Sequence, residues 1–380
     1  MPKWPWSYAP AAVFVLLLIA ASALAGDDEE ALPGYCAMAR IDDAAGLELA
    51  GGHADLVRGV AFTTRTPMPV GSVSKTLIGV ALAQLARDGQ LDLDAPLEAA
   101  LGWPVENPAH PGRPVTLRQL ATHSSGMYDD ETDYRAAYVP LATQPMALEA
   151  YLKAYLGAGS DTRRPNRFRE WAPGTRYEYS NIGAALAALA VEQQTGMAFA
   201  DYVRSRILQP LGMDDSGYPG FAHGPAAVPR ATLYEGGDPV PPYQLVTYPD
   251  GGLVSTCSDM QRFAEAVLKA RLGAPSSLDP AVVALMLEPQ WTKPLRGAPA
   301  RVENHGLFWE MRASGSIGHT GGDPGLTTVL AIDPSLRLAR VQLTNTGLDD
   351  NAAAVAEFKS LWSALEEDAP RAHASADHAD

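Results

Sequence analysis

Hydrophobic and polar positions divide the chain into a strand-rich start, a long helical middle and a strand-rich end. The start, from about Tyr35 to Val70, is predicted to form strands. From Ser72 the next segment is predicted to be a helix whose side chains are apolar nearly all round. Asp88-Gly89 ends this helix, because glycine favours the position just beyond a helix C-terminus. A helix that is apolar on all sides belongs in the middle of a core.

Two further helices are predicted in the middle of the chain. Residues Asn181 to Gln194 place apolar side chains on one face, and Gly196 follows the end of the helix. The next helix is marked by the apolar residues Phe199, Val203 and Ile207.

The last third of the chain is predicted to contain a capped helix, a hairpin and a final helix. Ser258 with Gln261 forms a capping box before an apolar stripe. The segments Thr327 to Ile332 and Leu338 to Thr344 alternate or are apolar around Asp333-Pro334, which predicts a hairpin. The final helix has an apolar stripe that can cover a sheet, made of Val355, Phe358, Trp362 and Leu365.

Strands at both ends of the chain thus flank an inserted helical block, which indicates an α+β fold. We expect one domain over residues 26–367. Its sheet lobe takes about residues 34–71 and 300–367, and its helical lobe about residues 72–299. If the two end segments share one sheet, the boundary between the lobes is a favoured place for a binding site.

The first 25 residues have the features of an export signal. Lys3 supplies a positive start, Val13 to Ala21 is an unbroken apolar run, and Ala23-Leu24-Ala25 is a small-x-small cleavage site. The apolar stretch is short for a membrane span. We expect residues 1–25 to be removed, leaving a periplasmic or secreted protein with no stable membrane span. An uncleaved N-terminal membrane anchor is the alternative.

Composition agrees with a folded, exported protein. The 380 residues are 47% hydrophobic and carry a formal net charge of −15, so nucleic acid is not an expected partner. Residues 368–380 lack large apolar side chains and are predicted to be disordered. Two cysteines exclude a disulfide scaffold, and no Cys/His cluster has zinc spacing. In an oxidising compartment Cys36 and Cys257 can pair, or they can remain two buried thiols.

Ser72-Val73-Ser74-Lys75 is the first segment with chemical potential, because it matches S-x-x-K. On a helix, residues three apart lie on one face, which places Lys75 beside Ser72. Serine needs a base next to it to act as a nucleophile, and burial in the apolar helix would lower the lysine pKa enough for that role. An N-cap serine with an exposed lysine is the alternative for this motif taken alone.

Two further segments supply polar groups of the same kind. Tyr179-Ser180-Asn181 immediately precedes a helix. A tyrosine hydroxyl near a lysine ammonium can have a lowered pKa and act as an acid or base, while Asn181 can hold Lys75 or a substrate carbonyl. In His319-Thr320-Gly321-Gly322 the glycines allow a substrate close to the backbone. A backbone N–H there and that of Ser72 can form an oxyanion hole.

Together, in this order, the three segments resemble the S-x-x-K, Y-x-N and K-T-G motifs of class C β-lactamases and their relatives. Those relatives include family VIII carboxylesterases, D-aminopeptidases and DD-carboxypeptidase-like enzymes. The resemblance covers roughly residues 34 to 347. It extends to Thr116 to Gly126, Ala172-Pro173-Gly174, Pro210 to Met213, and Gly251 to Thr256.

The resemblance implies a mixed, mainly antiparallel sheet built from both chain ends, flanked by helices, with an all-helical lobe inserted. It also implies that Ser72 attacks a carbonyl to give an acyl-enzyme, that Lys75 and Tyr179 move the proton, and that the N–H groups of Ser72 and Gly322 hold the oxyanion. Asn181, His319, Thr320 and Gly321 then belong to the substrate-binding residues. No metal or organic cofactor is implied.

Two departures separate the chain from true β-lactamases. His319 stands where they carry lysine, and a histidine is only partly charged near neutral pH, so an anionic substrate should bind more weakly or with pH dependence. The glutamine that class C enzymes carry shortly after T-x-G is absent, because Gly126 is followed by Met127-Tyr128-Asp129-Asp130. Both departures favour an esterase or a D-peptidase.

Several alternatives stay open. Asp129 and Asp130 either face a substrate amine or form a solvated acidic loop, and His123 is expected to pack and hydrogen bond. Tyr248 and Trp309 either line the pocket or lie in the core. The leading hypothesis is an exported serine hydrolase acting on a small ester, amide or peptide. The runner-up is a true β-lactamase or DD-carboxypeptidase, and a non-catalytic peptide-binding relative is the third possibility.

Overall fold

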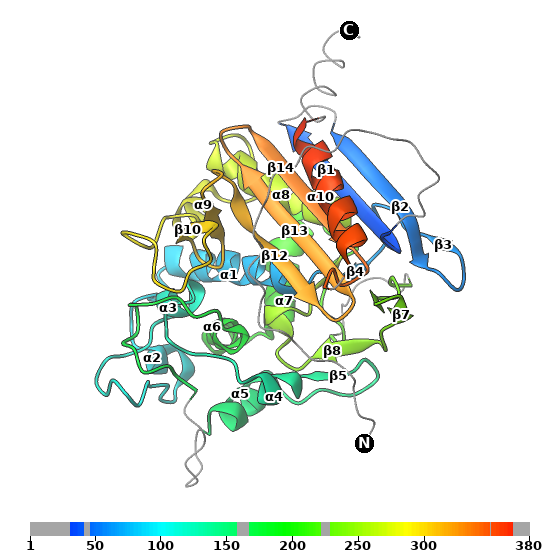
Figure 1. Ribbon diagram of the computed structural model, residues 1–380. Helices are drawn as coiled ribbons and strands as arrows, with labels where there is room; N and C mark the ends of the chain where they lie inside the picture. The colour runs from blue at the N-terminus through cyan, green and yellow to red at the C-terminus, as the bar shows by residue number, and fades with distance from the viewer. Residues whose placement is uncertain (1–30, 42–45, 158–166, 222–228, 350, 368–380) are drawn as a thin grey trace. The chain divides into compact units, whose positions relative to one another are not determined.

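The computed structural model describes residues 31–41, 46–157, 167–221, 229–349 and 351–367 (Figure 1). The described residues from Ala31 onward form one compact unit. The predicted signal peptide over residues 1–25 and the predicted disordered tail over residues 368–380 lie outside the described residues.

One large sheet joins the two ends of the chain, as the resemblance to class C β-lactamases implied. Its strand order is β10-β11-β12-β13-β14-β1-β2-β3, and each neighbouring pair is antiparallel. The strands are β1 (Gly34–Ile41), β2 (Leu47–Asp55), β3 (Val60–Ala61), β10 (Val302–His305), β11 (Glu310–Arg312), β12 (Ile317–Asp323), β13 (Leu326–Asp333) and β14 (Leu338–Thr344).

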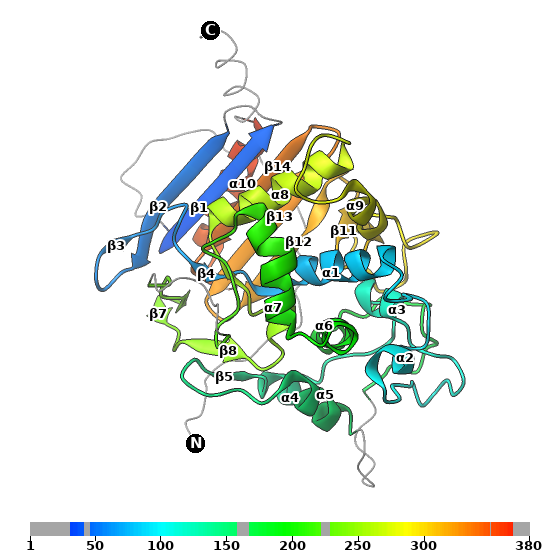
Figure 2. The ribbon, with the colours of Figure 1, turned by 180° about the vertical axis from the view of Figure 1, so that it is seen from behind.

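Helices cover both faces of this sheet (Figures 1 and 2). The last helix, α10 (Ala352–Glu367), lies on one face, where Leu365 and Trp362 pack against Ala37 and Leu338. On the other face α8 (Cys257–Arg271) packs against β1, β13 and β14. The centre of the sheet is therefore an inner layer, and β14 is buried at every residue, whereas the edge strands β2 and β3 are largely exposed or half-buried.

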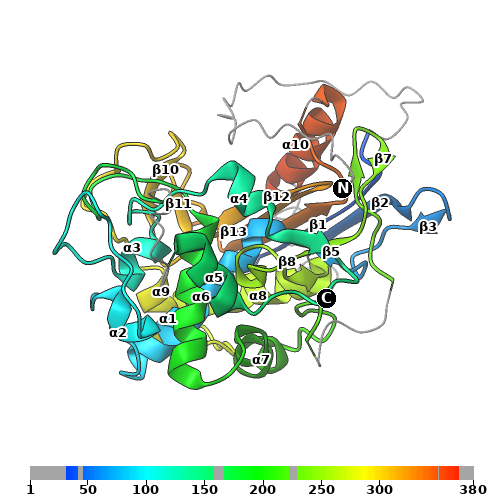
Figure 3. The same ribbon diagram turned by 90° about the horizontal axis from the view of Figure 1, so that it is seen from below.

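The block between β4 (Met68–Pro69) and β10 is mainly helical. In Figure 3 α6 lies at its centre, and it contacts α1, α2, α3 and α5. The block also holds the strand pairs β4–β9, β5–β8 and β6–β7. Its elements are α1 (Lys75–Arg87), α2 (Leu97–Leu101), α3 (Leu117–Ala121), α4 (Glu131–Arg135), β5 (Tyr138–Pro140), α5 (Leu148–Leu156), α6 (Asn181–Thr195), α7 (Phe199–Val203), β6 (Tyr234–Glu235), β7 (Asp238–Pro239), β8 (Tyr243–Leu245), β9 (Val254–Ser255) and α9 (Pro280–Met286).

Three short 3₁₀ helices and one short π-helix complete the described part of the block. They are η1 (Gly71–Ser74), η2 (Arg204–Leu208), η3 (Gln209–Leu211) and η4 (Tyr248–Asp250). The predicted helix from Ser72 is thus a 3₁₀ turn, η1, that continues into α1 at Lys75. Of the residues in α1, Leu77 to Ala83 are fully enclosed, in agreement with the expected core position.

The predicted capping box of Ser258 and Gln261 is wrong by two residues. Helix α8 starts at Cys257, and Thr256 is its N-cap, accepting a hydrogen bond from the Asp259 N–H. The Ser258 hydroxyl instead donates to the Thr64 carbonyl. Two hydroxyl residues that are two positions apart made the local pattern ambiguous, and tertiary contact decided which of them caps the helix.

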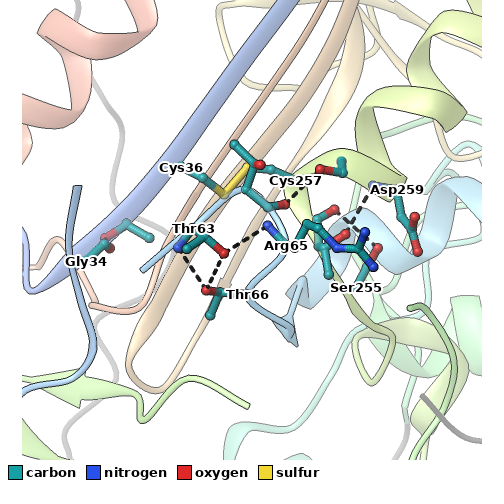
Figure 4. Close-up of a disulfide and its surroundings, with 12 residues drawn as sticks. Gly34, Cys36, Thr63, Arg65, Thr66, Ser255, Cys257 and Asp259 are labelled. Carbon is teal, nitrogen blue, oxygen red and sulfur yellow. Dashed lines mark hydrogen bonds between the residues drawn. A yellow bond between two sulfur atoms is a disulfide. The ribbon is translucent and has the colours of Figure 1, made fainter. Parts of the chain in front are cut away.

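Cys36 of β1 and Cys257 of α8 form a disulfide, although they are 221 residues apart in sequence (Figure 4). Both cysteines are fully buried where α8 crosses the sheet. The sequence left open a disulfide or two buried thiols, and the structure has the disulfide. No helix among the described residues is long and apolar enough to cross a membrane.

Candidate active site

Ser72 lies on η1 with two proton-carrying groups on its hydroxyl oxygen. Its Oγ is 2.8 Å from the Lys75 Nζ and 2.9 Å from the Tyr179 hydroxyl. Lys75 has no exposed surface, whereas Ser72 and Tyr179 are partly exposed. The short 3₁₀ turn brings the S-x-x-K pair together, because residues three apart nearly eclipse in that geometry.

The Lys75 ammonium group is held by three oxygens. Besides Ser72, its Nζ donates to Asn181 Oδ1 at 2.7 Å and to the Asp250 backbone carbonyl at 2.7 Å. These last two oxygens only accept hydrogen bonds. If Lys75 is neutral, its two N–H groups must point to them, and its lone pair is left for the Ser72 hydroxyl. In that protonation state the geometry allows Lys75 to accept the Ser72 proton.

Burial lowers the pKa of Lys75, while the carboxylates of Asp250, Asp323 and Asp129 oppose that shift. This is the shift that the sequence analysis required of a lysine base. For Tyr179 burial acts in the opposite direction and raises the pKa well above its usual value. The expected lowering of the tyrosine pKa is therefore wrong: the hydrogen bond with Ser72 lowers it only partly, so the hydroxyl carries its proton.

His123 holds the backbone on both sides of Tyr179. Its carbonyl accepts from the Glu178 N–H at 2.7 Å, and its Nδ1 accepts from the Ser180 N–H at 3.2 Å. Its ring lies 4.3 Å from the Tyr179 ring, centroid to centroid. The φ angle of 51° at His123 turns both the carbonyl and the ring towards this segment. The expected packing and hydrogen-bonding role of His123 agrees with these contacts.

The start of α6 is capped by two side chains. Ser180 is the N-cap and accepts from the Gly183 N–H. The Asp129 carboxylate accepts from the N–H groups of Asn181 at 2.6 Å and Ile182 at 3.1 Å, and from the Ser180 hydroxyl at 2.7 Å. A carboxylate at a helix N-terminus is favoured by the helix dipole. It also fixes the position of Asn181.

Neither interpretation is correct for Asp129, whereas Asp130 is partly exposed and so agrees with a solvated acidic loop. Asp129 is occupied by the helix terminus, so it is neither a solvated charge nor free to bind a substrate amine. Asp130 caps α4 by accepting from the Asp133 N–H. The sequence could not show this, because the α6 terminus is about fifty residues away from the loop that caps it.

Strand β12 brings the third motif against η1. A Cβ atom on Gly321 would lie 2.3 Å from the Val70 carbonyl oxygen and 3.2 Å from the Ser72 nitrogen. One on Gly71 would lie 3.2 Å from the Gly322 nitrogen. Only glycine allows this approach, which places the amide groups of Ser72 and Gly322 on adjoining segments. Gly322 is exposed and Thr320 is partly exposed, so this edge of the site faces solvent.

His319 lies beneath this edge and is buried. Its Nδ1 is 2.6 Å from the Thr320 carbonyl oxygen, so Nδ1 carries the hydrogen and donates it. Burial lowers the pKa of His319 to about 3, although Glu310 favours the charged form. The ring is therefore neutral near pH 7, and the expected partial charge is wrong. The third motif contributes no cation to the site.

Two carboxylates that the sequence analysis did not single out lie close to Lys75. Burial raises the pKa of Asp250 to about 7, and it raises that of Asp323 to about 6, while Lys75 lowers both. Asp250 ends η4, and Asp323 ends β12, directly after Gly322. The position of Asp323 directly after the third motif is the one sequence feature that could have drawn attention to it. No local pattern marks Asp250.

Tyr248 and Trp309 lie in the core rather than in a pocket. The Tyr248 hydroxyl donates to Glu192 at 2.7 Å, and its ring packs against Phe221. Trp309 has no exposed surface and packs against Phe263. Of the two interpretations of these aromatics, burial in the core is the correct one. Among the described residues, no group of His, Cys, Asp or Glu side chains is arranged to hold a metal ion.

Comparison with known proteins gives one consistent family. The family model described as Beta-lactamase matches residues 20–360. The D-alanyl-D-alanine-carboxypeptidase/endopeptidase AmpH of Escherichia coli (strain K12) is 27% identical over 272 residues, which are 70% of this chain and 67% of AmpH. The D-aminopeptidase of Brucella canis is 32% identical over 167 residues, which are 44% of this chain and 29% of that protein.

Solved structures show the same fold. The D-amino acid amidase from Ochrobactrum anthropi SV3, complexed with L-phenylalanine amide, superimposes with a TM-score of 0.68 at 24% identity. The match covers 88% of this chain and 93% of the amidase. The α+β fold expected from the sequence, of the β-lactamase/transpeptidase type, is confirmed.

Proposed function

Because the chain belongs to the Beta-lactamase family, we propose that it is a serine hydrolase that forms an acyl-enzyme on Ser72. The observation that carries the proposal is the Ser72 Oγ, which contacts both the Lys75 Nζ and the Tyr179 hydroxyl. A nucleophile within hydrogen-bond reach of a base, with the base held by further groups, is the arrangement that covalent catalysis needs. A binding protein has no use for all of these contacts.

In the first step the Ser72 proton moves to the neutral Lys75 amine as Oγ forms a bond to the substrate carbonyl carbon. Asn181 and the Asp250 carbonyl keep the other amine hydrogens engaged, so the lone pair remains directed at Ser72. The carbonyl oxygen becomes an oxyanion, which the N–H groups of Ser72 and Gly322 stabilise.

In the second step the oxyanion collapses and the bond to the leaving group breaks. The protonated Tyr179 hydroxyl donates its proton to the leaving amine or alcohol and regains one from the Lys75 ammonium. Water then attacks the acyl carbonyl, its proton is taken by the same base, and Ser72 Oγ leaves with a proton. No metal or organic cofactor takes part in these steps.

The substrates proposed are esters, amides or small peptides. The printed names of the relatives include a D-aminopeptidase and a D-alanyl-D-alanine-carboxypeptidase/endopeptidase. A β-lactamase or DD-carboxypeptidase activity is the second candidate, favoured by the similarity to AmpH. The neutral His319 argues against it, because those substrates carry a carboxylate that a permanent cation would bind.

We further propose that the protein acts after export, with residues 1–25 as its signal. The Cys36–Cys257 disulfide supports this proposal, because such bonds persist in oxidising compartments. Detection of the mature N-terminus by mass spectrometry of the secreted or periplasmic fraction tests it. A chain that keeps residues 1–25 in a membrane fraction would indicate the anchored alternative.

The serine hydrolase proposal is tested by labelling. The purified protein is incubated with a fluorophosphonate, a β-lactam probe, a nitrophenyl ester and a D-Ala-D-Ala peptide, and adducts are located by mass spectrometry. We expect an adduct on Ser72 that Ser72→Ala abolishes. Ser205→Ala removes an exposed serine from another part of the chain and is expected to leave the adduct unchanged. Absence of any adduct on Ser72 contradicts the proposal.

A further inference from the structure

The turn between β12 and β13 follows one of the two N–H groups of the proposed oxyanion hole. Strand β12 ends at Asp323, directly after Gly322, and Pro324 and Gly325 lead into β13. Three of the five residues 321–325 are glycine, which gives this backbone wide conformational freedom. Connecting segments are also more mobile than the strands they join. An oxyanion donor, in contrast, must be held at roughly 2.7–3.1 Å from the oxygen.

Two tyrosine hydroxyls hold the first half of this turn. Tyr138 of β5 donates to Asp323 Oδ1, and Tyr243 of β8 donates to the Pro324 carbonyl at 3.1 Å. Strands β5 and β8 pair with each other, and the two tyrosine rings lie 5.4 Å apart, centroid to centroid. In Figures 1 and 2 β8 lies beside the end of the β12–β13 hairpin. The two hydroxyls therefore come from one hydrogen-bonded pair of strands.

Strand β6 holds the second half of the turn. The Gly325 N–H donates to Glu235 Oε2 at 2.7 Å. Gly325 has a φ of 76°, and a Cβ atom on it would lie 2.7 Å from the Leu233 Cβ and 3.0 Å from the Tyr234 nitrogen. The three bonds to the turn thus come from residues 81 or more positions away in sequence. A hairpin turn forms without such bonds, so they serve to fix where this turn lies.

Asp323 also contacts the segment that carries the other proposed oxyanion donor. A Cβ atom on Gly71 would lie 3.1 Å from Asp323 Oδ2 and 3.2 Å from the Gly322 nitrogen. Gly71 directly precedes Ser72, whose N–H is the second donor. The Asp323 side chain therefore lies between the two segments that supply the donors. Holding this side chain in place holds the two N–H groups at a fixed separation.

We propose that Tyr138 and Tyr243 are positioning residues that hold the Gly322 N–H in the oxyanion hole. The inference rests on the proposed serine hydrolase function and adds how this chain fixes the geometry of that site. Both hydroxyls act through the turn to which they are bonded. Loss of either one leaves the contact of Ser72 with Lys75 intact, but it lets the Gly322 N–H move. Stabilisation of the transition state then falls while substrate binding changes little.

The experiment compares a p-nitrophenyl ester with the thionoester of the same acid, in which sulfur replaces the carbonyl oxygen. Two well-placed N–H donors fit an oxyanion better than the larger sulfur, so the wild type is expected to favour the ester in kcat/KM by at least ~10-fold. In Tyr138→Phe we expect kcat for the ester to fall by ~10-fold with KM nearly unchanged. The ester-to-thionoester ratio is expected to fall as well. Tyr243→Phe should change both quantities in the same direction.

Tyr151→Phe is the matched control. It also removes a tyrosine hydroxyl that donates to a backbone carbonyl, that of Asp133 at 3.2 Å, but this bond does not involve the turn. Its kcat and its ester-to-thionoester ratio are expected to stay at the wild-type values. A second pair of variants tests for rescue. Asp323→Asn keeps an oxygen that can accept from Tyr138, whereas Asp323→Ala does not, so the asparagine variant is expected to retain more of kcat.

The outcomes separate the two proposals, with thermal unfolding used to confirm that each variant is folded. If the fluorophosphonate labels Ser72 but Tyr138→Phe has the kcat and the substrate ratio of the wild type, the positioning role is overturned and the serine hydrolase function stands. A lower kcat with an unchanged ratio would indicate a general structural loss, which also overturns the positioning role. If Ser72 of the wild type is not labelled at all, the function fails and the inference fails with it.

Discussion

The two sides of Ser72 differ in how their polar groups are bonded. On one side the Lys75 amine contacts Ser72, Asn181 and the Asp250 carbonyl, so each of its three bonding positions is filled. On the other side the Asp250 carboxylate accepts from the Tyr134 hydroxyl through Oδ1, while Oδ2 lacks a well-formed hydrogen bond among the described residues, and the Thr247 hydroxyl lies close enough to lower the pKa of this carboxyl. Both regions are buried and both have shifted pKa values, so burial and pKa do not distinguish them.

The difference indicates two kinds of task. A fully bonded group is held in one orientation, which suits a base that must point at one atom. A buried carboxylate with weaker hydrogen bonds is costly in its charged form, so its protonation is the property that pH changes. Predictions that act on each side separately can therefore break or sharpen this comparison.

The largest effect is expected on the fully bonded side. Tyr179→Phe removes the proton donor to the leaving group while keeping the ring that packs on His123. We expect kcat for an amide substrate to fall by ~10²-fold or more. Steady-state kinetics checks this, with the p-nitrophenyl ester as the control, because its leaving group needs less help from an acid. Wild-type rates on the amide would remove Tyr179 from the mechanism.

A smaller effect on stability is expected on the Asp250 side. Burial raises the pKa of Asp250 to about 7 from its usual 3.8, so the folded protein binds more protons than the unfolded chain between these values. The free energy of unfolding contributed by Asp250 is therefore present below pH 4 and is lost as pH rises through 7.

Asp250→Asn tests this contribution, because asparagine stays uncharged throughout. Relative to wild type, the variant is expected to gain stability from pH 4 to pH 8, by on the order of 4 kcal/mol. Urea unfolding at both pH values measures it. Asp94→Asn, at an exposed ion pair with Arg118, serves as the control and is expected to show no such gain. A pH-independent difference for Asp250→Asn would contradict the burial of its charge.

The smallest effect is expected at His123, which touches Tyr179 without touching Ser72. His123→Phe keeps a ring against Tyr179 but loses the acceptor for the Ser180 N–H. We expect kcat to fall by about 10-fold with KM nearly unchanged, because Tyr179 is no longer held in position. His123→Asn keeps an acceptor and tolerates the left-handed backbone, so it should recover part of kcat. Equal losses in both variants would indicate a general loss of folding.

Whether the sequence could predict a feature depends on how far apart in sequence the contacting residues are. The pairing of Ser72 with Lys75 is local, because three residues of one helical turn determine it. The contact of Tyr179 with Ser72 spans 107 positions, and only the resemblance to a known family brought it within reach. The hydrophobic periodicity predicted strands at both chain ends, because strand and helix periods differ in a local window, but that they share one sheet came only from the resemblance.

The errors arise where a tertiary contact overrides a local pattern. Asp129 looked like part of an acidic loop, but the N-terminus of α6 folds onto it. His319 looked like a half-charged ring, but the core around it excludes water and keeps it neutral. Tyr248 could equally have faced a substrate, until Glu192 was found to bind its hydroxyl. None of these contacts has a counterpart in the residues that are adjacent in sequence.

The strand order also determines when the sheet can be completed during synthesis. Strand β1, made first, lies between β2 and β14, and β14 is among the last segments to be made. The sheet can close only when nearly the whole chain has emerged, which makes it a fold of high contact order. Until β14 has been made, β1 has only β2 as a pairing partner in the sheet. The pairing of β1 with β14 therefore joins the first and the last parts of the described chain, and truncation near the end would leave β1 with β2 as its one partner in the sheet.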